Sequence, residues 1–147
     1  MAQFGRPSTD TTRDNWEEDD GTTVNIFDQI DEAVADDLDY IRTVLTPTSD
    51  VYVTKLTTLE DPVSSAGHIV RYRYRKDADA GDQIDLTVQL RQGYVSEVSL
   101  GTLIHSEVHT NIPGTGWTAG TFTLSGAEAD SITDYTDLYL RFVGNKV

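Results

Sequence analysis

The sequence predicts an all-β protein: a β-sandwich or jelly-roll-like domain preceded by an extended N-terminal arm with one short helix. From Val51 onward, apolar and polar residues alternate with the period of two that is typical of strands. These runs are short, regularly spaced and separated by turn residues, with almost no helical spacing between them. We therefore divide the chain into a polar, acidic arm over residues 1–45 and a sandwich domain over residues 46–147.

The N-terminal arm is too polar to fold alone. Residues 1–24 contain glycine, proline and the acidic run EEDDG, and they offer little apolar surface to bury. Phe4 and Trp16 are the exceptions, and Arg6 lies close to the first of them in the chain. Aromatic side chains in a polar segment indicate docking, either on a partner or on the chain's own domain. Phe4, Arg6 and Trp16 are therefore candidate interface residues.

Two short helical segments are predicted. Near residues 26–35, apolar residues recur at helical spacing, and Asn25 stands where it could cap the first turn. Further along the chain, Ser125 is followed three residues later by Glu128, which is the spacing of a capping box. We expect this second segment to form one or two helical turns that connect the two sheets.

Alternating runs predict the strands of the sandwich. The clearest run is IDLTVQL, in which Ile84, Leu86 and Val88 point to the core and the polar residues between them point away from it. The predicted strands cover residues 51–56, 69–75, 84–90, 94–100, 103–112, 121–124 and 137–143. Strands of this length joined by polar turns are typical of a sandwich or jelly roll.

A row of basic residues lies on one predicted strand. The run IVRYRYR places Arg71, Arg73 and Arg75 on one face and the tyrosines on the other. This row has two explanations. It is either a solvated face that pairs with acidic neighbours or a docking stripe, because guanidinium groups bind carboxylates bidentately. The acidic N-terminal segment could supply those carboxylates, within one subunit or between two.

The net charge of the chain disfavours several kinds of partner. The formal net charge is −14, and residues 1–50 carry 13 acidic against 3 basic residues. Such a chain repels phosphate backbones and anionic lipid surfaces, so we expect neither nucleic acid nor a membrane as its partner. The sequence has no cysteine, which excludes disulfides and thiolate metal sites. The N-terminus lacks the apolar core of a signal peptide, so we expect synthesis in the cytosol.

The sequence indicates no catalytic, metal or cofactor site. His105 and His109 lie four residues apart, which separates them by about 13 Å along a strand. The run KDADAGD at 76–82 lacks the glutamate that closes an EF-hand loop. Neighbouring carboxylates in the arm have no apolar pocket to raise one pKa, and no nucleophile elbow or phosphate-binding glycine loop is present. We therefore expect no enzymatic activity.

Several strand and turn segments resemble those of a known family. The strings GHIVRYRYRKD, QIDLTVQLRQG and HTNIPGTGWTAGTFTLSGAEADSITDYTDLYLRF, together with IDEAVADDLDYIRT after Trp16, resemble a module of virion structural proteins of tailed bacteriophages. The resemblance covers most of residues 67–143 and part of residues 16–43. It implies a small β-sandwich displayed on a virus particle.

Within that family, a short chain with one β domain and a polar arm is similar to capsid decoration, or cement, proteins. The resemblance implies that the protein binds the major capsid protein on the outer surface of the capsid, above the junctions between capsomers. It also implies a homotrimer. The alternative is a carbohydrate- or receptor-binding domain of a tail or head fibre, for which Trp117 is the candidate stacking residue.

Overall fold

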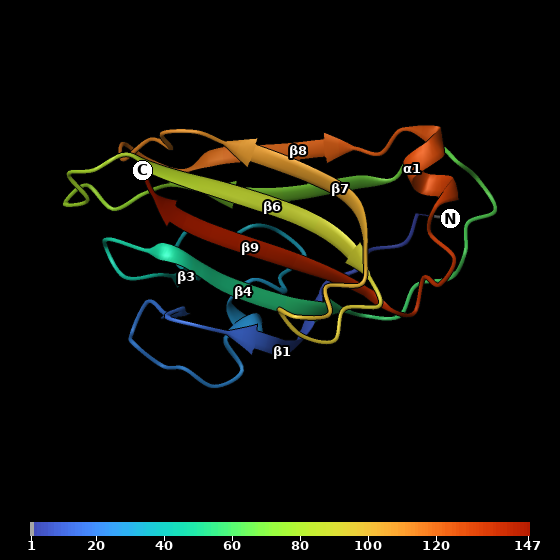
Figure 1. Ribbon diagram of the computed structural model, residues 1–147, viewed down its shortest axis with the longest axis horizontal. Coiled ribbons are helices and arrows are strands. Elements are labelled where there is room, and N and C mark those ends of the chain that lie inside the picture. Colours follow the sequence, from blue (N-terminus) through green and yellow to red (C-terminus); the bar gives the residue numbers. More distant parts are fainter. Residues whose placement is uncertain (1) are drawn as a thin grey trace.

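The protein has an all-β, sandwich-like fold, as the sequence predicts. The computed structural model describes residues 2–147, and its larger layer is a five-stranded antiparallel sheet with the order β1-β4-β9-β6-β7 (Figure 1). The strands of this sheet are β1 (Pro7–Arg13), β4 (Thr48–Leu56), β6 (Ile84–Gln92), β7 (Thr102–His109) and β9 (Leu138–Lys146).

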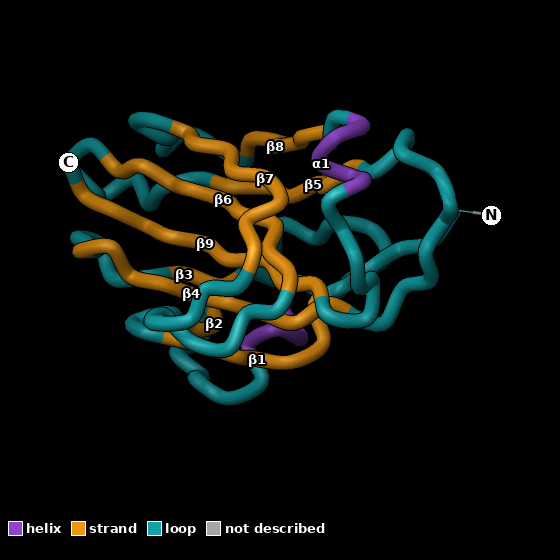
Figure 2. Tube along the Cα trace, turned by 45° about the vertical axis from the view of Figure 1, so that its right-hand side comes forward, coloured by secondary structure: helices purple, strands orange, loops and turns teal. Residues whose placement is uncertain are grey.

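Two short ribbons form the second layer. β5 (Ile69–Tyr74) pairs with β8 (Thr118–Thr123), and β2 (Glu17–Glu18) pairs with β3 (Ile41–Arg42). Figures 1 and 2 show this layer behind the large sheet, with β5 and β8 on the side of β7 and with β2 and β3 on the side of β1. The second layer is therefore two separate ribbons rather than one continuous sheet.

The main core lies between the two layers. Ile84, Leu86, Val88 and Leu90 of β6 are buried there, as their alternation predicts. The inward side chains of β5 and β8 pack against the same core, and so do those of β9. At 25 cal/mol per Å² of buried apolar area, side chains of this size each contribute about 1.5–3 kcal/mol when fully buried.

A second apolar cluster lies on the opposite face of the large sheet. Val51 and Val53 of β4 and Tyr139 of β9 pack there under Tyr94, which is only 3% exposed. The sequence predicts a strand over residues 94–100, but this segment is a loop with one tight turn that folds back over the sheet. Because both faces of β4 are covered, its central residues are buried without alternation.

The N-terminal segment does not extend from the domain, contrary to the expectation of an arm over residues 1–45. β1 is an edge strand that pairs antiparallel with β4. Trp16, just beyond β1, is 8% exposed and belongs to the main core. The main-chain hydrogen bonds of β1 and the burial of Trp16 hold this polar segment in place, although few of its other side chains are apolar.

The helix expected near residues 26–35 is a single 3-10 turn, η1 (Ile26–Gln29). Asn25 lies in the left-handed region with a φ of 58° and makes no side-chain cap. Instead, the carboxylate of Asp10 on β1 accepts hydrogen bonds from the backbone N–H groups of Ile26 (2.9 Å) and Phe27 (3.0 Å). Residues 33–39, where the helix would continue, are all exposed, so no buried apolar face supports further helical turns.

The predicted capping box at Ser125 is confirmed. It begins the short helix α1 (Gly126–Asp130), and Ser125 and Glu128 accept hydrogen bonds from each other's backbone N–H groups. Within residues 2–147, no helix is long and apolar enough to cross a lipid bilayer.

Substituting Gly101 by alanine is expected to lower the free energy of unfolding by about 3 kcal/mol. Gly101 has a φ of +65°, and a Cβ there would lie 2.2 Å from the backbone oxygen of Gln92. Gly67 is a matched control, since its φ is +84° but a Cβ would meet nothing within 4 Å. Gly67→Ala should therefore cost only about 1 kcal/mol. Equal losses in urea unfolding would contradict the steric argument.

Candidate functional site

The arginine row on β5 has the orientation that the sequence predicts. Arg71, Arg73 and Arg75 are exposed, whereas Tyr72 and Tyr74 are half-buried and pack against the main core. Tyr72 also faces Gly120 on β8, where a Cβ would lie 2.3 Å from the tyrosine ring. The absence of a side chain at Gly120 thus leaves room for the Tyr72 ring against β8.

An irregular segment over residues 31–40, here termed the strap, crosses beside β5. Arg73 makes two hydrogen bonds to the carboxylate of Asp37, at 2.5 and 2.7 Å. Both side chains are well exposed (36% and 43%), so this ion pair contributes only about 0–1 kcal/mol. The row therefore finds one carboxylate partner within the chain.

One end of the strap is held by aromatic and cationic side chains. The guanidinium of Arg75 lies 5.0 Å from the ring centroid of Trp117 and 5.8 Å from that of Tyr40. The rings of Tyr40 and Trp117 meet edge to face at 5.4 Å. Trp117 is therefore in contact with two neighbours of its own chain, and a sugar would have to displace Arg75 to stack on that face of the indole.

The other end of the strap contacts Arg6. The Arg6 guanidinium donates hydrogen bonds to the backbone oxygens of Asp31 (3.3 Å) and Glu32. It also lies 5.7 Å from the ring centroid of Phe4, which is 65% exposed. Phe4 and Arg6 thus lie near the opposite end of the strap from Arg75.

Trp16 does not belong to this surface. Its indole N–H donates a hydrogen bond to the backbone oxygen of Asp50 (3.0 Å), and its ring lies 6.2 Å from that of Tyr52 in the core. Of the two possibilities left open by the sequence for Trp16, packing on its own domain is the one that the structure shows. Trp16 is therefore a core residue and is not available to a partner.

A cleft of 1630 Å³ opens between the strap, β5 and the inner face of the large sheet. Its walls are mainly apolar and include Tyr72, Leu140 and Phe142, and the strap and the arginine row stand at its rim. The volume exceeds the roughly 300–1,000 Å³ that is typical of small-molecule pockets. The cleft is lined by residues of both the β5–β8 ribbon and the β2–β3 ribbon, which do not join into one sheet.

The strap carries apolar side chains that the domain does not cover. Val34 and Leu38 are 80% and 77% exposed, and all residues from 33 to 39 are exposed. Val44 and Leu45, which follow the strap, and Val24, which precedes η1, are also half or more exposed. The sequence pattern does not predict this exposure, because Val34 falls within the helical spacing of residues 26–35.

The histidines form hydrogen bonds but not a catalytic group. His105 shares a hydrogen bond of 2.7 Å with Glu128, and the Ser125 hydroxyl donates to that same carboxylate rather than to the imidazole. The Nε2 atom of His109 shares a hydrogen bond of 2.6 Å with the hydroxyl of Tyr72. No nucleophile and base are paired here, and residues 2–147 contain no cluster of metal-ligating side chains.

Substituting Glu128 by glutamine should destabilise the protein in a pH-dependent way. Hydrogen bonds from His105 and from Ser125 lower the pKa of Glu128 from 4.5 to about 2. A group with a depressed folded-state pKa stabilises the fold fully above its unfolded value and loses this effect as pH falls through the folded value. The difference between wild type and Glu128→Gln should thus be greatest above pH 4.5 and shrink toward pH 2. Urea titrations across this range test this, and a constant difference would contradict it.

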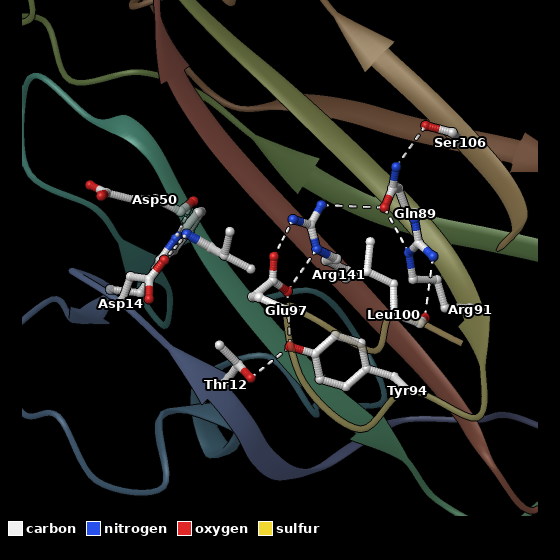
Figure 3. Close-up of polar contacts among 12 residues, drawn as sticks. Thr12, Asp14, Asp50, Gln89, Arg91, Tyr94, Glu97, Leu100, Ser106 and Arg141 are labelled. Carbon is white, nitrogen blue, oxygen red and sulfur yellow. Dashed lines mark hydrogen bonds and ion pairs between the residues drawn. The ribbon is translucent and has the colours of Figure 1, made fainter. Parts of the chain in front are cut away.

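A polar network that the sequence did not indicate covers the outer face of the large sheet (Figure 3). Arg141 binds both oxygens of Glu97, at 3.0 and 2.5 Å, and Glu97 also accepts a hydrogen bond from Tyr94 (2.8 Å). The bonds from Arg141 and Tyr94 lower the pKa of Glu97. Gln89 links Arg141 to the buried Arg91. The network fixes the 93–101 loop on the sheet, so its role is structural.

Comparisons of this chain with family models, with curated proteins and with solved structures find no match. The candidate functional site therefore rests on geometry alone. It is a candidate interaction surface, made of the β5 arginine row, the strap, the cleft between them, and the aromatic and arginine contacts at the two ends of the strap.

Proposed function

We propose that this chain is a structural virion protein that binds the outer surface of a bacteriophage capsid and stabilises the shell. Its partner would be the major capsid protein, and the chain would act as a homo-oligomer, as a trimer by the resemblance. The proposal combines the resemblance of its strand and turn segments to virion proteins with the candidate interaction surface formed by the strap and the β5 arginine row.

The observation that carries the proposal is the exposure of large apolar side chains in and around the strap. Val24, Val34, Leu38, Val44 and Leu45 are between 50% and 80% exposed. A single exposed apolar residue needs no explanation, but five of them within residues 24–45 favour a surface that docks. Covering them with capsid protein would remove apolar area from water, which favours the complex and offsets the freedom that both partners lose on association.

This surface also changes how attachment to a capsid would work. Because β1 and Trp16 belong to the fold, we place the capsid contact on the strap and its flanks rather than on a free N-terminal arm. An oligomer would present several such surfaces at once, which raises avidity without tight single contacts. The net charge of −14 would keep the unassembled protein soluble and disfavours contact with nucleic acid or an anionic membrane.

The alternative function, a receptor- or carbohydrate-binding fibre domain, is less well supported. It requires an aromatic face that is free to stack on a sugar. Arg75 lies over the ring of Trp117 at 5.0 Å, and Tyr40 approaches it edge-on. The capsid proposal needs no such rearrangement.

The number of copies of this protein in purified virions tests the proposal. A decoration protein should be present within a few-fold of the number of major capsid protein chains, as measured by quantitative mass spectrometry. A handful of copies would contradict it and assign the protein to a tail, neck or fibre.

A binding assay with variants tests the role of the strap. Val34→Asp/Leu38→Asp should weaken attachment of purified protein to particles that lack it, because two apolar contacts become charged. Val63→Asp/Val98→Asp is the matched control, since Val63 and Val98 are 92% and 98% exposed and lie in other loops. Equal binding of the two double variants would show that the strap is not the contact.

A further inference from the structure

One edge of β5 has no strand partner. Within residues 2–147, β5 pairs only with β8, and the neighbouring ribbon of β2 and β3 is separate from it. The strap passes this edge, but none of its residues is in a strand. An open edge presents unpaired backbone N–H and C=O groups, which are a template for an added strand.

The side chains of β5 specify what kind of strand would fit this edge. Its outer face carries Arg71 and Arg73, and its inner face carries Tyr72 and Tyr74 beside the apolar cleft. An added strand would place alternate side chains opposite these two rows. It should therefore alternate acidic residues, which face the arginines, with apolar residues, which enter the cleft.

The strap of this chain has that alternation. In the run Asp37-Leu38-Asp39-Tyr40, the two carboxylates would lie on one face of a strand and the two apolar side chains on the other. The spacing of two residues between Asp37 and Asp39 equals that between neighbouring arginines of the row. A strand with this sequence could thus form two ion pairs and bury two apolar side chains on the same edge.

Within one chain, the strap and β5 make only some of these possible contacts. Asp37 reaches Arg73, but Leu38 is 77% exposed, and Arg71 has no ion pair within residues 2–147. The strap is tethered at both ends, because the N–H of Ile30 bonds to Phe27 in η1 and residues 41–42 form β3. The strap therefore contacts the arginine row through Asp37 but forms no strand pairing with β5.

We propose that the strap of one copy of this chain pairs as a strand with the free edge of β5 in a second copy. Asp37 and Asp39 of the donor copy then face the arginine row, and Leu38 and Tyr40 enter the cleft. The cleft volume of 1630 Å³ suits a segment of polypeptide better than a small ligand, for which pockets of about 300–1,000 Å³ are usual. This contact between copies does not depend on the proposed attachment to a capsid.

Charge-reversed variants of the purified chain, alone and mixed, test the exchange. Asp37→Arg and Arg73→Asp should each weaken self-association at least ~10-fold, because like charges then meet at the interface. In an equimolar mixture, Arg73 of one variant meets Asp37 of the other, and the two reversed residues also form an opposite pair. The mixture should therefore associate more strongly than either variant alone, as measured by light scattering, and native mass spectrometry should show mixed oligomers.

A contact confined to one chain predicts a different result. Each variant would keep its own repulsive pair, so mixing would restore nothing. A monomeric wild type, or association that neither substitution weakens, would also overturn the exchange. Lys146→Asp is the control, because it disrupts a similarly exposed ion pair with Asp82 that involves neither the strap nor β5, and it should leave association unchanged.

Hydrogen exchange supplies a second measurement that does not depend on the variants. Backbone amides on the free edge of β5 should exchange more slowly in the wild-type oligomer than in dilute monomer, because strand pairing protects them. Unchanged exchange would contradict strand addition. A protein that exchanges straps but is missing from virions would leave this inference standing and remove the proposed function.

Discussion

Trp16→Ala is expected to lower the free energy of unfolding by about 3–5 kcal/mol. Trp16 is 8% exposed, packs against Tyr52, and donates its indole N–H to the backbone oxygen of Asp50 at 3.0 Å. Alanine would leave a cavity in the main core and an unpaired carbonyl group. For a domain of this size the loss corresponds to a decrease in melting temperature of roughly 10 °C or more, which calorimetry measures.

Phe4→Ala is the control for this prediction. Phe4 belongs to the same N-terminal segment but is 65% exposed, so its removal should change stability by less than about 0.5 kcal/mol. If both variants had wild-type stability, the N-terminal segment would not be part of the folded domain. A large effect of Trp16 alone would establish that the segment before β4 contributes to the core.

Asp10→Ala is expected to lower the free energy of unfolding by about 3 kcal/mol. The carboxylate accepts hydrogen bonds from the backbone N–H groups of Ile26 and Phe27 and from the hydroxyl of Tyr52, at 2.8–3.0 Å. Tyr52 is fully buried, so its hydroxyl would remain without this partner. Urea unfolding measures the loss.

Two further variants define the origin of that loss. Asp10→Asn keeps a side-chain oxygen that can accept some of these bonds, so it should lose less stability than Asp10→Ala. Asp19→Ala removes the same charge from an exposed position and should be nearly neutral. If Asp19→Ala cost as much as Asp10→Ala, the effect would come from net charge rather than from the hydrogen bonds.

These predictions bear on the proposed function because Asp10 joins β1, β4 and η1. η1 holds one end of the strap, and β3 holds the other. Weakening this anchor should make the strap less well positioned beside β5 while the sandwich remains folded. The stability of the N-terminal segment and the docking properties of the strap are therefore linked through η1.

The sequence determined the parts of the fold in which each residue's environment follows from its neighbours in the chain. The period of two in β6 placed Ile84, Leu86 and Val88 in the core, and the alternation in β5 placed the arginines on the outer face. The capping box at Ser125 depends on residues only three apart, so it too could be predicted.

Only the tertiary structure decided the placement of polar or irregular segments. The polar residues of β1 show no strand pattern, yet the strand forms because β4, more than thirty residues later, offers a free edge. Residues 94–100 do alternate, but Tyr94 and Glu97 bond to side chains of β1 and β9, which fixes the segment as a loop. The strap and its cleft likewise arise from contacts between distant segments. A local pattern reports how a residue relates to its neighbours in the chain, whereas these placements depend on which distant surfaces remain to be covered.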